Sequence, residues 1–230
     1  MTRILVCWGT VFILALTVGS HSVPAASQEL ENRLAECTDT LKGMMRAPDA
    51  SIPGDLLKRS QAIVIFPSLL KAGLGFGGHY GKGVILRRDP SSGKWGPPAF
   101  MRLAGGSFGW QAGVQATELV LLITSRIGLK SLFRDKFTIG ADASVAAGPL
   151  GRDASAGTDL ALSEGILSYS RAKGLFVGVS IKGSILEPDW AANESYYGSD
   201  VSLIDIFFKG RGKVSPAASK LMATLNDYTK

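Results

Sequence analysis

The middle third of this chain concentrates side chains that could bind anions. Twelve lysine or arginine residues lie between Lys58 and Lys136 beside only three acids, a local charge of +9 in a chain whose formal total is +6. Ammonium and guanidinium groups form charge-assisted hydrogen bonds with phosphate and carboxylate oxygens. A concentrated positive field also attracts polyanions from a distance. The pattern indicates an anionic partner, such as a membrane surface or another polyanion, and says nothing about catalysis.

One short motif resembles a catalytic one. Residues 105–109 (GGSFG) match the G-x-S-x-G nucleophile motif of serine hydrolases. That motif needs a strand-to-helix turn and a histidine later in the chain. No histidine follows Ser107, and the residues after it alternate as in a strand. We therefore expect no hydrolase of this type.

Cofactor and metal motifs fail in a similar way. Gly73, Gly75 and Gly78 match G-x-G-x-x-G, but the following residues continue a strand where the dinucleotide fingerprint needs a helix. After residue 25, His79 and Cys37 are the only histidine and cysteine, too few for a typical zinc site. We expect a hydrogen-bonded structural histidine and a buried, unreactive thiol. The sequence predicts no catalytic residue, no metal and no cofactor.

The first 25 residues have the pattern of a secretory signal peptide. Arg3 precedes an apolar run over residues 4–18, and small residues with Val23-Pro24-Ala25 then offer a cleavage site. The run is short for a membrane span, although an uncleaved anchor remains an alternative. We expect a signal peptide over residues 1–25, export to the periplasm or the medium, and one domain over residues 26–230. Export also argues against a nucleic-acid partner.

The elements that must position the basic residues follow from hydrophobic periodicity. Helical spacing predicts helices over residues 29–46 and 55–60, and Ser215 followed by Pro216 predicts a helix over residues 216–228. The segments between them favour strands: residues 62–66 (closed by Pro67), 73–86, 108–123, 137–147, 165–170 and 175–185, with 201–208 as a strand or short helix. Glycines repeated along one face of a strand favour strong curvature. The expected fold is α+β: a strongly curved, mainly antiparallel β-sheet or barrel-like core with N-terminal and C-terminal helices.

A connecting helix is expected near the end of the basic stretch. Arg126, Lys130 and Arg134 are spaced by four, and Leu132 and Phe133 occupy the neighbouring arc. A basic stripe beside an apolar arc is the layout of a helix in a membrane interface. The alternative is a surface helix that buries Leu132 and Phe133 against the sheet and solvates its basic residues.

Longer stretches of the sequence resemble a known family. These are IPGDLLKRSQAIVIFPSLLKAGLGFGGHYGKGVILRRD from Ile52, GKWGPPAFMRLAGGSFGWQAGVQATELVLLI, GADASVAAGPLGRDAS, and ILSYSRAKGLFVGVSIKGSIL with YYG after it. Together they resemble the SYLF-domain family, with a core over residues 52–210. The resemblance implies a lipid-binding module without catalytic activity. Eukaryotic members bind phosphoinositides and other anionic phospholipids, and fungal members also bind and bundle actin.

Some members of that family attach to membranes through an amphipathic N-terminal helix. Here that helix carries Glu29, Glu31, Glu36 and Asp39, which makes it a poor match to an anionic bilayer. The signal peptide is a second departure, and it fits a bacterial exported member. We therefore expect the basic middle third to bind the lipid. The candidate lipid-binding residues are Lys71, Lys82, Arg87, Arg88, Lys94, Trp95, Arg102, Arg126, Lys130 and Arg134.

Stable attachment to a bilayer also needs apolar insertion. Trp95, in the turn beside Lys94, and Phe133 are the candidates, and the alternative for Trp95 is a rim residue that packs over the sheet. The predicted function is an exported module that associates with anionic phospholipid membranes through a basic face. The alternative is a non-enzymatic scaffold that binds another macromolecule, as the actin-binding relatives do.

Overall fold

The computed structural model describes residues 25–47, 51–132, 136–151, 165–199, 201–209 and 214–230. The predicted signal peptide (except its last residue), Phe133 and Arg134 lie outside these ranges. The helices are α1 (Ala25–Met45), α2 (Gly54–Arg59), α3 (Arg126–Ser131), α5 (Trp190–Tyr197), α6 (Leu203–Lys209) and α7 (Pro216–Tyr228). The strands are β1 (Ala62–Arg87), β2 (Ala99–Ile123), β3 (Phe137–Thr138), β4 (Val145–Ala147), β5 (Ile166–Ala172), β6 (Leu175–Phe176) and β7 (Ile185–Pro188). The predicted α+β class with a strongly curled, mostly antiparallel sheet is confirmed.

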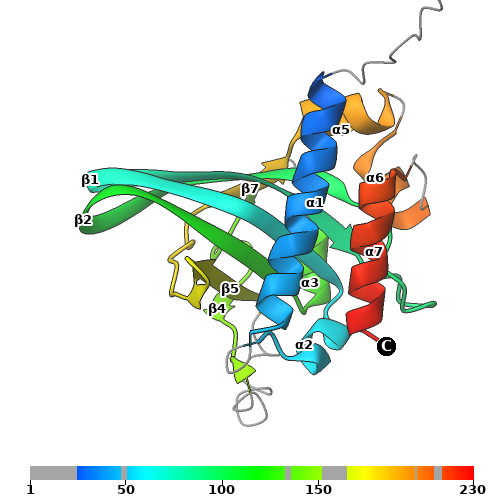
Figure 1. Cartoon of the computed structure of the whole chain (residues 1–230), viewed down its shortest axis with the longest axis horizontal. Helices are drawn as coiled ribbons and strands as arrows, with labels where there is room; N and C mark the ends of the chain where they lie inside the picture. Colours follow the sequence, from blue (N-terminus) through cyan, green and yellow to red (C-terminus); the bar gives the residue numbers. More distant parts are fainter. Residues whose placement is uncertain (1–24, 48–50, 133–135, 152–164, 200, 210–213) are drawn as a thin grey trace, which may run out of the picture.

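The sheet is organised around β2. Its first half pairs with β7 (Met101 opposite Pro188), its second half pairs with β5 (Ile123 opposite Ile166), and β1 pairs with it along nearly its whole length. The strand order is β3-β7-β2-β5-β4, and β4 runs parallel to β5. Since β1 occupies one edge of β2, β7 and β5 share the other edge, one beside each half of the strand. The sheet built in this way is strongly curled (Figure 1).

The β1–β2 pair forms a long ribbon that runs out to a tip and folds back on itself (Figure 1). Glycines make the close approach of its two halves possible. A Cβ added at Gly83 would lie 2.2 Å from the carbonyl oxygen of Ile65, and one at Gly77 would lie 2.5 Å from that of Ala72. The expectation that the repeated glycines allow strong curvature is confirmed at these positions.

Some predicted strand boundaries were wrong. β1 does not end at Pro67 but continues through it, because a register shift between Phe66 and Leu69 accommodates the residue that lacks an N–H. The segments 137–147 and 175–185 are not continuous strands, since turns with positive φ interrupt them at Gly140 (89°) and Gly183 (81°).

The segment whose type was left open, residues 201–208, contains a helix. The hydroxyl of Ser202 accepts a hydrogen bond from the N–H of Asp205 at 3.1 Å, and the Asp205 carboxylate accepts one from the N–H of Ser202 at 3.2 Å. This reciprocal pair is a capping box, which starts α6 and selects helix over strand.

Two apolar clusters lie on opposite faces of the sheet. Along β1, Ile63 and Ile65 face one cluster with α1, α2 and α7, whereas Val64 and Phe66 face the other with α3 and α6. Successive side chains of a strand point to opposite faces, so a strand buried on both faces has no polar positions. This accounts for the uninterrupted apolar run at residues 62–66.

Both predicted terminal helices form: α7 spans the predicted residues, and α1 begins at Ala25, four residues before its predicted start. Helices α1 and α7 lie side by side over one face of the sheet (Figure 1). The hydroxyl of Ser215 accepts a hydrogen bond from the N–H of Ala218 at 3.2 Å and caps α7, whose first residue is Pro216. Within the described ranges, none of the helices has the length and apolar character needed to span a bilayer.

Candidate functional site: a basic cleft

Four of the predicted anion-binding residues line one cavity of about 790 Å³. Its walls come from the C-terminal ends of α2 and β1, the turn after β1, α3 and α6. Five basic side chains and one acid border this basic cleft, together with an aromatic ring: Arg59, Arg87, Arg88, Arg126, Lys130, Asp89 and Phe208. α6 and the turn after β1 lie on the side of the body away from the ribbon tip (Figure 1).

The acid of the cleft is engaged within its own turn. One carboxylate oxygen of Asp89 accepts hydrogen bonds from the N–H of Ser91 at 3.0 Å, the N–H of Ser92 at 2.7 Å and the Ser92 hydroxyl at 2.9 Å. These bonds, with a smaller contribution from the charge of Arg87, hold the pKa of Asp89 below its usual range. Asp89 therefore shapes the turn and forms no ion pair with the arginines.

Neither Arg87 nor Arg88 forms an ion pair within the part of the chain that the structure describes. Arg87 donates from Nη1 to the carbonyl oxygen of Phe207 at 2.8 Å, and its guanidinium lies 4.5 Å from the centre of the Phe208 ring. Arg88 donates from Nε to the carbonyl oxygen of Gly93 at 2.8 Å, and from Nη1 to that of Lys58. The buried Nε of Arg87 has no hydrogen-bond partner in the described part of the chain. The backbone thus orients both guanidinium groups and leaves donor capacity for an anion.

Helix α3 supplies the other wall of the cleft. The Ser125 hydroxyl caps it by accepting a hydrogen bond from the N–H of Gly128 at 2.9 Å. Arg126 and Lys130 are exposed, whereas Leu132 is 3% exposed and packs in the core. The burial of Leu132 agrees with the alternative given for this segment, a surface helix that buries its apolar side against the sheet. Arg126 and Lys130 project from it as expected.

The other predicted basic residues do not join this cleft. Lys82 lies 3.5 Å from the carboxylate of Glu29, and Arg102 lies 2.9 Å from that of Glu187, so nearby acids offset both charges. Lys71 is half-buried on the ribbon and Lys94 is exposed on the turn after β1. Of the predicted basic residues that the structure describes, four line the cleft, three lie on the ribbon and Lys94 lies on the turn between β1 and β2.

Trp95 is in the core and is only 2% exposed. Its indole N–H donates to the Thr229 hydroxyl at 3.2 Å, and its backbone N–H donates to the side-chain oxygen of Asn226 at 3.1 Å. A β-bridge to Arg88 turns this residue back under the end of α7. Neither bilayer insertion nor a position at the rim fits this placement.

The sequence analysis missed three residues at or beside the cleft. Arg59 lies in the last turn of α2. On α6, Ile204 is 57% exposed and Phe208 is 51% exposed, while Phe207 between them along the chain is buried. A spacing of four places Ile204 and Phe208 on one face in a helix and in a strand alike. A strand would add Ile206 to that face, whereas the helix buries Ile206 and leaves Ile204 and Phe208 exposed.

His79 and Cys37, the histidine and the cysteine of the described residues, are both buried. His79 is 4% exposed, and its Nε2 lies 2.7 Å from the Ser184 hydroxyl, as expected of a structural histidine. Burial raises the pKa of the Cys37 thiol. No group of three His, Cys, Asp or Glu side chains in the described ranges could hold a metal ion.

Comparisons with known proteins cover most of the chain. A family model described as "Ysc84: Las17-binding protein actin regulator" matches residues 104–228. Protein YSC84 of Saccharomyces cerevisiae is 37% identical over 180 residues, which cover 77% of this chain and 38% of that protein. SH3 domain-containing YSC84-like protein 1 of Homo sapiens is 30% identical over 184 residues, 80% of this chain and 53% of that protein. The chain thus spans between about two fifths and half of the length of these relatives.

Proposed function

Because the chain belongs to the Ysc84 family, which is the SYLF-domain family, we propose that it is a binding domain whose basic cleft docks an anionic macromolecular surface. The observation that carries this proposal is the charge state of the cleft. Five basic side chains face one acid, and the hydrogen bonds of Arg87 and Arg88 go to backbone carbonyls. An arriving carboxylate or phosphate therefore meets oriented donors and displaces no ion pair formed among the described residues. This function requires no catalytic group.

A protein partner is the first candidate, because the description of the family refers to an actin regulator and to the binding of a protein, Las17. Acidic side chains on a partner surface would pair with the guanidinium groups of the cleft, which can bind carboxylates in a bidentate manner. Complementary charge of this kind raises association rates and selects partners.

Co-sedimentation with actin filaments tests this candidate. The double variant Arg126→Gln/Lys130→Gln removes two exposed cations of the cleft and leaves the buried side of α3 intact. At about 1 kcal/mol for each exposed charge, binding should weaken about thirty-fold. The matched control is Lys173→Gln/Lys220→Gln, which removes two exposed lysines outside the cleft. Equal binding by both double variants would remove the cleft from the interaction.

An anionic membrane is the second candidate, and a separate observation favours it. Ile204 and Phe208 are exposed on α6, and Phe208 also borders the cleft. A Lys or Arg near an anionic bilayer contributes about 1 kcal/mol, and burying an aromatic side chain adds about 1.5–3 kcal/mol. Cations beside exposed apolar residues supply both parts of a peripheral membrane contact.

Co-sedimentation with vesicles separates the two candidates. A domain that binds anionic membranes should sediment with phosphatidylglycerol or cardiolipin vesicles and not with phosphatidylcholine vesicles. The variant Ile204→Ser/Phe208→Ser should reduce vesicle binding without reducing binding to actin filaments. Sedimentation with phosphatidylcholine to the same extent would contradict a charge-driven contact.

We also propose that the domain acts after export, on the basis of the signal-peptide pattern in residues 1–25. Export would place it beside envelope lipids and away from cytoplasmic actin, and would therefore favour the membrane candidate over actin. N-terminal sequencing of the protein recovered from the medium or periplasm tests this, with a mature chain starting near residue 26 as the expected result.

A further inference from the structure

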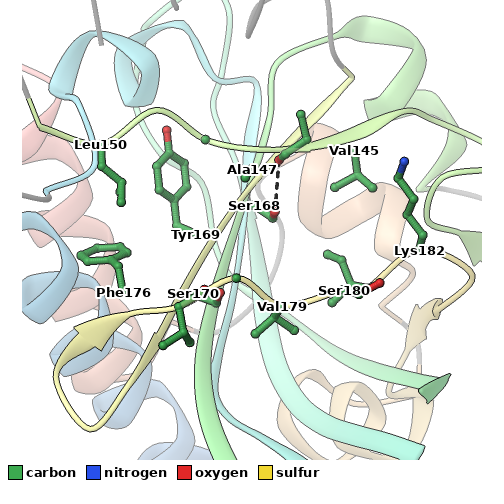
Figure 2. A pocket seen from close by; sticks show the side chains of 15 residues that line it. Val145, Ala147, Leu150, Ser168, Tyr169, Ser170, Phe176, Val179, Ser180 and Lys182 are labelled. Carbon is green, nitrogen blue, oxygen red and sulfur yellow. Dashed lines mark hydrogen bonds between the residues drawn. The ribbon is translucent and has the colours of Figure 1, made fainter. Parts of the chain in front are cut away.

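A second cavity, of about 440 Å³, lies at the edge of β5 (Figure 2). Two segments diverge there. The N–H of Gly148, just after β4, donates to the carbonyl oxygen of Ser168 at 2.9 Å, and the N–H of Val177, just after β6, donates to that of Ser170 at 2.9 Å. The cavity opens between these two segments, over residues 168–170. None of its lining residues borders the basic cleft.

The interior of this β5 cavity is apolar. Val145, Leu150, Phe176 and Val179 contribute carbon surface to its lining. The hydroxyls on the β5 side are already used, because Ser168 donates to the carbonyl oxygen of Ala146 at 3.1 Å and Ser170 donates to that of Val177. An entering group would therefore meet mostly side-chain carbon.

Tyr169 supplies the one buried, unsatisfied polar atom of the lining. The tyrosine is 2% exposed, and its hydroxyl has no hydrogen-bond partner in the described part of the chain. The hydroxyl end of its ring packs against the backbone of Gly148, where an added Cβ would lie 2.1 Å from Cζ. Gly148 thus lets the aromatic ring serve as part of the apolar wall.

A single cation borders the cavity on the side away from Leu150 and Phe176 (Figure 2). Lys182 is exposed, makes no ion pair within the described ranges, and has no acid among its fellow lining residues. Its stem packs against Gly140, where an added Cβ would lie 3.3 Å from Cγ of Lys182. An apolar slot with one positive charge at its edge is complementary to an amphiphile with an apolar chain and an anionic head.

We propose that the β5 cavity binds one acyl chain of a single-chain anionic amphiphile. The carboxylate or phosphate head lies beside Lys182, and the chain runs past Val145 and Val179 toward Phe176 and Leu150. The volume is near the lower end of the range for ligand sites, about 300–1,000 Å³, which suits one chain better than a diacyl phospholipid. This site is independent of the proposed docking function, since it uses other residues.

Isothermal titration calorimetry on the full domain tests the proposal with three probes that share one chain length: decanoate, decyl phosphate and decan-1-ol. We expect the two anions to bind at one site and the alcohol to bind more weakly. The two anionic arms distinguish a fatty acid from a phosphate ester as the preferred head. Lys182→Gln should weaken anion binding about five-fold and leave the alcohol unchanged, while Lys220→Gln should change neither.

A filling variant tests the chain-binding part separately. Val145→Phe places a larger side chain in the wall and should weaken all three probes at least ten-fold. If Val145→Phe does not fold, the Lys182→Gln variant still tests the proposal, because the Lys182 side chain is exposed and contributes nothing to the core. Absence of anion binding, or equal anion affinity of Lys182→Gln and Lys220→Gln, would overturn the proposal. The probes require neither actin nor a bilayer, so failure here would leave the proposed function of the cleft unaffected.

Discussion

Replacing Gly83 by alanine tests the folded ribbon that carries the whole sheet. The added Cβ would lie 2.2 Å from the carbonyl oxygen of Ile65 and 2.7 Å from Cδ1 of Phe66. Neither neighbour can yield easily, because one is a backbone atom and both residues are 0% exposed. The two halves of the ribbon must move apart, or the core around Phe66 must repack.

The magnitude follows from the cost of overpacking. Inserting carbon into a packed core costs about 1–3 kcal/mol, and a collision with backbone belongs at the upper end, about 3 kcal/mol. For a domain of this size each kcal/mol shifts the melting temperature by about 2–4 °C, so Gly83→Ala should lower it by about 6–12 °C.

Gly106→Ala is the matched control on the same ribbon. A Cβ at Gly106 meets no atom within 4 Å, and its φ is not in the left-handed region. Alanine also restricts the unfolded chain, so this variant should be neutral or gain up to about 1 kcal/mol. Thermal unfolding followed by circular dichroism, with urea titrations beside it, measures both. Equal melting temperatures for the two variants would refute the folded-back ribbon.

Three further predictions concern stability. Asp189→Ala removes the buried carboxylate that lies 3.2 Å from the guanidinium of Arg33, and leaves that guanidinium with the exposed carboxylate of Glu29 at 3.0 Å. The loss should cost about 3 kcal/mol, the lower end for a broken buried pair, read from the urea midpoint. Burial, with help from the charge of Lys71, lowers the pKa of His79. The unfolded chain therefore binds the proton first, so stability should be full above about pH 6.5 and fall as the pH drops toward the folded pKa. His79→Gln should flatten that decline in urea titrations between about pH 7.5 and 5; an unchanged slope would contradict it. Asn226→Ala removes the acceptor for the N–H of Trp95 and should cost about 1–2 kcal/mol in the same urea assay.

Local patterns were sufficient for the helices at the two ends. Spacing of apolar residues placed α1, and Ser215 with Pro216 placed the start of α7 at the observed residue. These signals act over three or four residues, so they can be read without the rest of the fold. The absence of a histidine after Ser107 likewise excluded a hydrolase triad of the G-x-S-x-G type without any coordinates.

The cleft illustrates the opposite case. Charge counting found Arg126 and Lys130, but it also selected Lys82 and Arg102, whose acidic neighbours Glu29 and Glu187 are distant in sequence. Pairing of this kind depends on how α1 and β7 pack against the ribbon. Composition cannot show which cations remain free, because an ion pair requires two groups to meet in space.

The sequence by itself determined the α+β class, the family and the positive charge of the middle third, because periodicity, motifs and composition belong to the chain. Only the tertiary structure decided which of those charges gather around one cavity. It buried Trp95 under α7 and left Ile204 and Phe208 exposed. It also placed Arg59 and Arg126, which are far apart in sequence, around the same cavity. The physical reason is the folding of the glycine-lined ribbon, which sets the elements around β2 and so selects the side chains that share one surface.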